Sequence, residues 1–462
     1  MPSKVYFMDD HAWSTPESTP FKAVKLLRDA GIETLFKKGA KVGIKVHFGE
    51  YGNSANLRPH WISPIVDEVK RLGGNPVLFD CCTAPFAIYS SRAIASDHLR
   101  TASSHGFNEE TIGCPIMICD GEYSQDQVEV EIPNGTLLKR SWMGKKILDF
   151  DAVIVVSHFK GHPMGVYGGA LKNVGIGMGS SRGKLATHFF THPTLGKKAY
   201  TVNQEAVQKM AAEPHPNMID LVLDTCAHGV YEMKDGILEH HVDKCKLCGL
   251  CFPYSAIFNT PPAVVPTWAP TIADAAAGYI NAIGAENMMY VNYAFDITPW
   301  CDCASFHDTP MVPNIGTFVS KDPVAVDMAA MEAAEERVAV PGSVADTFEF
   351  KEPNTERFTN CSSFAKQSQW QQINAGVYNG IGNAEYVLIK SVPLPEEEVW
   401  FPPYKPGKAP AQVHKEEFGK IDNDCGDFFY DESKVPIEEL SKKPSGKVKE
   451  ISIEEDVEPA LA

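Results

Sequence analysis

The sequence predicts an α/β protein with Rossmann-like, mainly parallel sheet domains, a small cysteine-bearing insertion and an extended C-terminal tail. Three observations predict this arrangement. Short apolar runs alternate with amphipathic stretches, three cysteines recur at intervals of three residues near the middle of the chain, and prolines and charges dominate residues 391–462. Strands that alternate with helices are typical of a largely parallel sheet.

The first half of the chain supplies most of the predicted strands. The apolar run over Asp151–Ser157 indicates a strand that is buried on both faces. Trp61–Leu72 has helical apolar spacing and ends at two glycines, where a C-cap is expected. The other elements predicted here are strands over Lys41–Phe48, Pro76–Asp80 and Met218–Asp224, and helices over Ala87–Ser104 and Gly196–Ala211.

A second α/β segment follows the cysteines. Pro323 suits the first turn of a helix with Asp322 as its N-cap, so we expect a structural role for that carboxylate. The elements predicted in this segment are helices over Ile272–Ile283 and Pro323–Glu336, and strands over Asn287–Tyr293 and Ile315–Ser320. The predicted parts of the chain are an α/β domain (1–225), the insertion (226–262), a second α/β segment packing on the first (263–390) and the tail (391–462).

Composition and charge argue against several classes of partner. The net charge of −17 disfavours binding to nucleic acid or to anionic lipid. The sequence shows no apolar leader and no run of about 18 apolar residues, so we expect neither a secretory signal nor membrane insertion. The 12 cysteines form clusters, unlike those of a disulfide scaffold. We therefore expect a cytoplasmic protein from an anaerobic or low-oxygen setting, and leave the oligomeric state open, a homodimer included.

The most informative motif is the run that contains Cys245, Cys248 and Cys251. Its C-x2-C-x2-C spacing wraps backbone around an iron–sulfur cluster, whose irons take thiolate ligands. Zinc is the alternative metal, although zinc sites usually combine two C-x2-C pairs or mix cysteine with histidine. The run therefore predicts that the insertion is ferredoxin-like and carries an iron–sulfur cluster, most simply [4Fe-4S].

A fourth cluster ligand is missing from this run, because no further cysteine follows it closely. Cys301 and Cys303 are the predicted source, since C-x-C is a common arrangement of thiolate ligands. Cys226, which is nearer in sequence, is the alternative. A ligand from the second α/β segment would couple the redox state of the cluster to residues that line the crevice described next.

The densest group of glycines and polar residues directly follows the strand at Asp151–Ser157. In a parallel α/β sheet, ligands bind beyond the carboxyl ends of the strands. Glycines let backbone N–H groups approach an anion, and basic side chains add positive charge. The sequence matches neither a Walker A motif nor a dinucleotide fingerprint. The residues expected to hold an anionic ligand, or a second anionic or nucleotide-like cofactor, are His158, Lys160, Lys172, Arg182 and Lys184, and the candidates for catalysis are His162, Lys172 and His188.

A second polar cluster lies just past the strand at Lys41–Phe48. Lys45, His47 and Arg58 are expected to face the same crevice as the glycine-rich loop, because both segments follow buried strands of one sheet. So many cations repel one another unless an anionic ligand or acidic side chains lie among them.

Taken together, these motifs resemble a family of uncharacterised iron–sulfur centre proteins, a domain-of-unknown-function family often fused to ferredoxin modules. The resemblance covers roughly residues 3–390. It rests on KVHFGEYGN and LRP, on SHFKGH, GGALKNVGIGMG and RGK, on the cysteine run, and on WCDC, DTP and IGTFVSKDPVAVD. Membership implies a cluster and a redox-linked role, without a settled reaction.

The segment from His162 to Lys172, followed by His188, also resembles the cofactor site of nickel-dependent lactate racemase. In that family the matching lysine carries a nickel-pincer nucleotide covalently, and the matching second histidine ligates nickel. Leu57-Arg58-Pro59 resembles the loop beside the nucleotide phosphate. After Pro76–Asp80 this chain lacks the histidine that would serve as an acid or base there.

The function expected from these features is that of a cytoplasmic iron–sulfur redox protein. It would transfer electrons between its cluster and an anionic ligand or a partner enzyme at the crevice, as an oxidoreductase if it is an enzyme. The expected partners are a redox protein and a small anionic molecule. One alternative is a pincer-cofactor-type isomerase or racemase, and another is a non-enzymatic electron carrier or assembly subunit.

Overall fold

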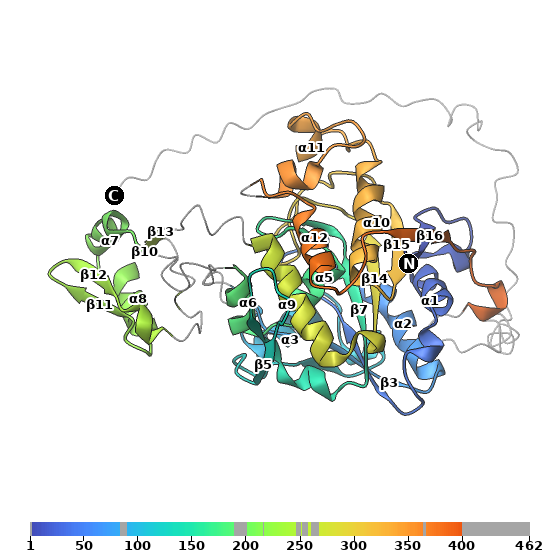
Figure 1. Cartoon of the computed structure of the whole chain (residues 1–462), viewed down its shortest axis with the longest axis horizontal. Coiled ribbons are helices and arrows are strands. Elements are labelled where there is room, and N and C mark those ends of the chain that lie inside the picture. Colours follow the sequence, from blue (N-terminus) through green and yellow to red (C-terminus); the bar gives the residue numbers. More distant parts are fainter. Residues whose placement is uncertain are drawn as a thin grey trace, which may run out of the picture. The chain divides into compact units, whose positions relative to one another are not determined.

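The structure of the protein is a computed structural model (Figure 1). It describes residues 2–83, 90–188, 201–215, 217–245, 251, 257–259, 268–363 and 366–399, to which every structural statement below refers. Cys248, the predicted tail beyond Val399 and the first residues of the helices predicted over Ala87–Ser104 and Gly196–Ala211 lie outside the described residues. No helix within the described ranges has both the length and the apolar character needed to cross a membrane.

A sheet of eight strands, in the order β16-β1-β15-β14-β7-β2-β3-β4, forms the centre of the described fold. Neighbouring strands are parallel except at β15, which is antiparallel to both β1 and β14. The mainly parallel α/β fold expected from the sequence is therefore confirmed, and both predicted α/β segments contribute strands to this one sheet. The strands are β1 (Ser3–Asp9), β2 (Lys41–Lys45), β3 (Asn75–Asp80), β4 (Ile116–Ile118), β7 (Ala152–His158), β14 (Met288–Ala294), β15 (Gly316–Ser320) and β16 (Tyr386–Lys390).

Helices pack on the sheet, and the local sequence sets where several of them begin. Pro59 is the first residue of α2. Asp322 caps α10 by accepting the backbone N–H groups of Val324 and Ala325, so the structural role expected for it is confirmed. The helices around the sheet are α1 (Thr19–Asp29), α2 (Pro59–Arg71), α3 (Ala95–Ser104), α4 (Glu109–Ile112), α5 (Ala170–Gly175), α6 (Ser181–His188), α9 (Trp268–Ile283), α10 (Pro323–Glu335), α11 (Val344–Thr347) and α12 (Gln371–Tyr378).

The two faces of the sheet bury two separate hydrophobic cores, because successive side chains of a strand lie on opposite faces. In β7, Val153 and Val155 belong to one core, whereas Ile154 and Val156 belong to the other. Residues of α5, α9 and α10 complete the first core, and residues of α1 and α2 complete the second (Figure 1). Burial on both faces explains the uninterrupted apolar run of β7.

The carboxyl ends of β2, β3 and β7 lie side by side. Lys45, the last residue of β2, is in register with Phe79 of β3 and with Val155 of β7. Asp80 and His158 are the last residues of their strands. The polar segments that follow these strands therefore meet at one edge of the sheet, where α/β proteins bind ligands.

Helices α5 and α9 approach each other closely at Gly175. A Cβ atom on Gly175 would lie 2.1 Å from the carbonyl oxygen of Ile272, which is a backbone atom of α9. Only glycine fits such an approach. The contact holds α5, which carries Lys172, against α9.

Residues between Thr201 and Asn259 form a small core of their own. Val207, Val222 and Leu238 are buried members of this core, so it includes helices that precede the predicted insertion. Its elements are β10 (Thr201–Val202), α7 (Gln204–Ala211), α8 (Met218–Thr225), β11 (Tyr231–Lys234), β12 (Ile237–His240) and β13 (Phe258–Asn259).

The prediction of a strand over Met218–Asp224 is wrong, because this segment forms α8. Asn217 caps the helix by accepting the N–H groups of Ile219 and Asp220, and Asp220 accepts the N–H of Asn217 in return. Ile219 and Val222, three residues apart, are buried on one side of the helix. The capping box, rather than the apolar run, decides the structure of this segment.

Candidate functional site

A pocket of about 470 Å³ lies at the edge of the sheet where β2, β3 and β7 end. The glycine-rich segment after β7 forms much of its wall through β8 (Lys160–His162), β9 (Val166–Gly168) and α5. The loop that follows β14 also lines the pocket. The titratable, cysteine and tryptophan side chains that line it are His47, Asp80, Cys81, Arg92, His158, Lys160, His162, Lys172, Lys184, His188, Trp300, Cys301 and Cys303.

Lys45 forms a buried ion pair with Asp80, which lines the pocket, but Lys45 itself does not line it. The Nζ atom of Lys45 lies 2.9 Å from Oδ1 of Asp80 and also donates to Oδ1 of Asn173. Burial raises the pKa of Asp80, but Lys45 and His98 outweigh burial and hold that pKa well below its usual range. Burial lowers the pKa of Lys45, and Asp80 opposes this shift. The carboxylate is therefore ionised, and its charge offsets that of the lysine.

Asp302 holds two basic side chains at the same pocket. Its Oδ2 lies 2.9 Å from Nζ of Lys160, and its Oδ1 lies 2.9 Å from Nδ1 of His158. The other ring nitrogen of His158 lies 2.7 Å from the carbonyl oxygen of Phe295, so only a ring protonated on both nitrogens satisfies both acceptors. Burial raises the pKa of Asp302, but His158 and Lys160 outweigh it and hold the pKa low. One carboxylate thus holds both basic side chains at the pocket.

Lys172 brings a further amine to the pocket from α5. Its side chain is buried, and the carboxylates of Asp80, Glu50 and Asp302 pair with other cations. Burial, followed by the charge of Lys160, holds the pKa of Lys172 well below its usual range, against an opposing effect of Asp302. A neutral amine is a nucleophile, and a nearby anion would restore its proton.

His162 presents an N–H group to the pocket. Its Nδ1 accepts the backbone N–H of Gly165 at 2.7 Å, so the proton of the neutral ring lies on Nε2. Burial, and then the charges of Lys172 and His188, hold the pKa of His162 well below its usual range. His47, also at the pocket, has the same tautomer because its Nδ1 accepts a backbone N–H at 2.9 Å.

His188 has the opposite tautomer. Thr187 donates its hydroxyl proton to the carbonyl oxygen of Lys184 at 2.7 Å, so it can only accept from Nδ1 of His188, 3.0 Å away. Nδ1 therefore carries the proton and Nε2 carries the lone pair. Burial and the charge of Lys172 lower the pKa of His188 to about 3. The rings of His162 and His188 lie edge to face, with centroids 5.8 Å apart.

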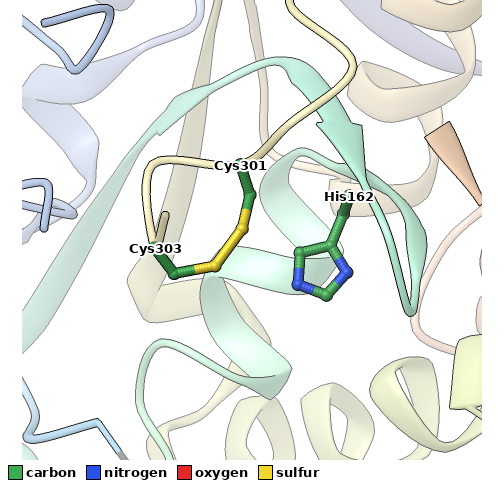
Figure 2. A group of neighbouring side chains, drawn as sticks. All are labelled: His162, Cys301 and Cys303. Carbon is green, nitrogen blue, oxygen red and sulfur yellow. A yellow bond between two sulfur atoms is a disulfide. The ribbon is translucent and has the colours of Figure 1, made fainter. Parts of the chain in front are cut away.

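Cys301 and Cys303 lie beside His162 at the pocket (Figure 2). The two sulfur atoms form a disulfide, and a ring nitrogen of His162 lies within 4.8 Å of both. Figure 2 shows one ring nitrogen turned toward the sulfur atoms and the other turned away. A disulfide offers no thiolate, so a cysteine of this pair would ligate a cluster only after reduction. The predicted cluster ligation by Cys301 or Cys303 stays a prediction.

Two cations predicted to share this pocket lie elsewhere. Arg58 pairs with Asp296 at 2.7 Å, and its guanidinium lies over the ring of Trp61. The guanidinium of Arg182 lies 3.8 Å from the centre of the Trp142 ring. Each of these two arginines stacks on an indole, outside the lining of the pocket, and the ligand binding expected of them stays a prediction.

Sequence reasoning missed two charged residues of the site and gave a weak signal for a third. Arg92, paired with Glu50 at 3.1 Å, belongs to no motif and carried no signal. Asp302 stands between two cysteines that drew the interpretation toward metal ligation. Asp80 ends a predicted strand at the carboxyl edge of the sheet, and this position alone is a signal for a binding site.

Three cysteines gather around Tyr231 in the small core of residues 201–259. The hydroxyl of Tyr231 donates to Sγ of Cys251 at 3.3 Å. Burial and Cys251, followed by Cys245 and Cys226, raise the pKa of Tyr231. The structure thus brings Cys226, the alternative fourth ligand, to the two described cysteines of the predicted cluster motif.

Comparison with known proteins gives one family match. The model of the family described as "Domain of unknown function (DUF362)" matches residues 42–332. No curated protein matches the chain. Among solved structures, the chain is similar to the lactate racemase apoprotein from Thermoanaerobacterium thermosaccharolyticum, with 11% identity, a TM-score of 0.35, and 73% of this chain and 59% of that chain covered. It is also similar to a protein from Thermotoga maritima, with 10% identity, a TM-score of 0.28, and 61% and 52% of the two chains covered.

Proposed function

This chain belongs to the DUF362 family, a domain of unknown function, and we propose that it binds a small anionic organic molecule in the pocket and moves a proton on it through His188, with His162 as a hydrogen-bond donor. The expected resemblance to a domain-of-unknown-function family is confirmed to that extent, and its iron–sulfur character stays a prediction. The reaction class that we propose is isomerisation or racemisation. The observation that carries the proposal is the pair of neutral imidazoles with opposite tautomers.

Proton transfer on carbon needs a base that removes the proton, and it is helped by a donor that stabilises the oxyanion formed. His188 has a lone pair on Nε2 that can take up the proton, and the Nε2–H group of His162 can donate a hydrogen bond to the oxyanion while keeping its proton. Their lowered pKa values keep both rings neutral across the physiological range. The imidazolium of His188 then returns a proton to the carbon, so both rings are neutral again after one turnover.

The buried amine of Lys172 favours the binding of an anionic ligand. Its amine is buried beside other cations, and an anion placed there would favour the protonated form. Binding of an anion is therefore expected to take up a proton from solution. A merely structural lysine would not couple binding to protonation.

Calorimetry tests the binding step. Lactate, as a small 2-hydroxy carboxylate, is titrated into the full chain in two buffers of different ionisation enthalpy, and the difference in heat reports the protons taken up. We expect uptake in the wild type and none in Lys172→Met, while Lys37→Met, at an exposed position, behaves as the wild type. Binding without proton uptake in the wild type would contradict the role of Lys172.

Solvent exchange tests the reaction. In deuterated water, deuterium should enter the substrate at the carbon next to the carboxylate, as observed by nuclear magnetic resonance. His162→Leu and His188→Gln should each slow this entry by about 10²-fold or more, which is the usual contribution of an oxyanion donor or a general base. An unchanged rate of deuterium exchange in both variants would contradict the proposal.

A cofactor of the nickel-pincer type, which the resemblance implies, fits the residues present. Lys172 offers a buried amine of lowered pKa for a covalent link, and His188 offers the lone pair of Nε2 to a metal. Such a group would add an electrophilic centre at the pocket, with His162 remaining the hydrogen-bond donor. An intact mass above that of the polypeptide, lost in Lys172→Met, is the expected sign of a linked group.

A second candidate function is electron transfer through an iron–sulfur cluster in the small core. The grouping of Cys226, Cys245 and Cys251 around Tyr231 favours it. We propose Cys226 as the fourth ligand, because it is already grouped with the described cysteines of the motif. Iron and sulfide analysis after anaerobic preparation should give about four irons per chain, as expected for a [4Fe-4S] cluster.

Two variants make this second test specific. Cys226→Ser should lower the iron content, whereas Cys361→Ser, in the sheet domain, should leave it unchanged. Tightly bound zinc in place of iron would exclude electron transfer, because zinc has no redox chemistry.

A further inference from the structure

We propose that the Cys301–Cys303 disulfide is a redox-active group that exchanges with a dithiol reductant at the pocket, and that His162 donates a hydrogen bond to the thiolate formed. The inference does not rest on the proposed proton transfer. It rests on the length of the loop that the disulfide closes, on its surroundings, and on the tautomer of His162.

The disulfide closes too short a loop to stabilise the fold appreciably. Its two cysteines are separated by 2 in sequence. The stabilisation that a disulfide gives by restricting the unfolded chain grows with the length of the closed loop. Hydrogen bonds already hold the intervening residue, because Asp302 binds Lys160 through its side chain and accepts the backbone N–H of Glu50 at 2.7 Å. A role other than holding the loop is therefore expected for the bridge.

The surroundings of the disulfide suit thiol chemistry. Cys303 is partly exposed, whereas Cys301 is 2% exposed, so a reductant entering the pocket meets Cys303 first. Reactive cysteines lie in partly exposed, electropositive places, because positive charge stabilises the thiolate. Lys160 lines the same pocket and supplies that charge, and a thiolate formed there would favour the protonated form of Lys172.

The tautomer of His162 favours a thiolate over a metal ion as its partner. A metal would need a lone pair on the ring nitrogen that faces the sulfurs, whereas Nδ1, which accepts the N–H of Gly165, keeps the proton of the neutral ring on Nε2. A ring nitrogen of His162 lies within 4.8 Å of both sulfur atoms. An N–H group at this place suits a hydrogen bond to a newly formed thiolate.

The reductant transfers its electrons by thiol–disulfide exchange in two steps. One thiolate of the dithiol attacks Sγ of Cys303, which forms a mixed disulfide and breaks the bond to Cys301. Cys301 leaves as a thiolate that accepts the hydrogen bond of His162. The second thiol of the reductant then attacks the mixed disulfide and releases Cys303. In sum, two electrons and two protons pass from the dithiol to the protein, and the reductant becomes a disulfide.

A redox titration of the full chain tests the proposal. The protein is equilibrated with mixtures of reduced and oxidised dithiothreitol, its thiols are alkylated, and peptide mass spectrometry measures the reduced fraction at each cysteine. We expect Cys301 and Cys303 to become reduced together while the protein stays folded, and to form the disulfide again on oxidation.

Variants of His162 test the hydrogen bond. His162→Leu should shift the equilibrium constant toward the disulfide by about tenfold, equivalent to about 30 mV for a two-electron couple. His162→Gln should restore much of the wild-type value, because its amide can donate from a similar place. His60→Asn, an exposed histidine of α2, should change nothing.

Three outcomes would overturn the inference. The first is a Cys301–Cys303 disulfide that stays oxidised in excess dithiothreitol until the protein unfolds. The wild-type protein alone is enough to observe this outcome. The second is an identical equilibrium constant in His162→Leu and the wild type. The third is a reduced protein that binds one zinc ion and hides both thiols from alkylation, which would make the group a metal site.

Discussion

The Nζ atom of Lys45 lies 2.9 Å from Oδ1 of Asp80, and this contact joins two neighbouring parallel strands by a buried pair of opposite charges. The second oxygen of Asp80 lies 3.5 Å from Nε2 of His98, which is also buried. Both charges stand at the carboxyl ends of their strands, so the same contact supports the sheet and shapes the pocket.

Removal of the carboxylate should leave a buried lysine without its counter-charge. Asp80→Asn is expected to lower the free energy of unfolding by about 3–5 kcal/mol, as found when one partner of a buried pair is removed. Urea denaturation measures the effect. Asp97→Asn, in an exposed pair with Arg100 at 3.0 Å, should cost less than about 1 kcal/mol. Equal losses in the two variants would contradict the buried ion pair.

Stability in acid should depend on Asp302. Its pKa is lowered in the folded protein by His158 and Lys160, so the stability it contributes is present above the pKa of an unfolded aspartate, about 3.9. This contribution is lost as the pH falls through that value toward the lower folded pKa. In urea denaturation, the difference in unfolding free energy between the wild type and Asp302→Asn should therefore shrink below about pH 4. A difference independent of pH would contradict the pairing.

The pH dependence of stability that comes from Asp327 should have the opposite sign. Burial raises its pKa to about 6, although the N–H groups of Ala170 and Leu171 and the side chain of Asn292 oppose the shift. The folded state then holds a proton that the unfolded state has lost between about pH 4 and 6, so this group's contribution to stability falls as the pH rises through that window.

A matched pair of variants isolates this effect. The difference in unfolding free energy between the wild type and Asp327→Asn should change across that window and be level above about pH 7. Asp149→Asn, at an exposed position, should give a level difference throughout. A slope in the control of the same size would show that the dependence does not come from Asp327.

Gly175→Ala should destabilise the protein, although alanine favours a helix by about 1 kcal/mol. The added methyl group would meet the carbonyl oxygen of Ile272 at 2.1 Å, and the backbone of α9 cannot move away without loss of packing. Gly376→Ala in α12 meets a methyl group of Val324 at 2.7 Å and should cost less, since a side chain can shift. Thermal unfolding compares the two, and a higher melting temperature for Gly175→Ala would contradict the close approach.

Several elements of the fold could be predicted because their sequences are locally consistent. The apolar run of β7 and the Asp-Pro start of α10 each allow one structure, and both were predicted within a residue or two. The segment at Met218–Asp224 was not, because an apolar run of seven residues suits a strand as well as a helix. Only the cap at Asn217, with its partner Asp220, distinguishes them.

The candidate site was predictable in part for a similar reason. Lys160, Lys172 and His188 follow a buried strand within one glycine-rich stretch, so proximity in sequence brought them to one pocket. Arg92 reaches the pocket from a different segment, and only the folded chain reveals that. The tautomers of the histidines depend on single hydrogen bonds, which no sequence pattern encodes.

The strand β1 has a consequence for how the chain emerges during synthesis. It is flanked in the sheet by β15 and β16, and Ser320 of β15 donates to the carbonyl oxygen of Lys4 across 316 residues. At a translation rate of about 5–20 residues per second, the strand made first waits roughly 15 to 60 seconds for its neighbours. During that time its backbone groups are open to other nascent chains, so a chaperone that shields β1 should raise the yield of folded protein.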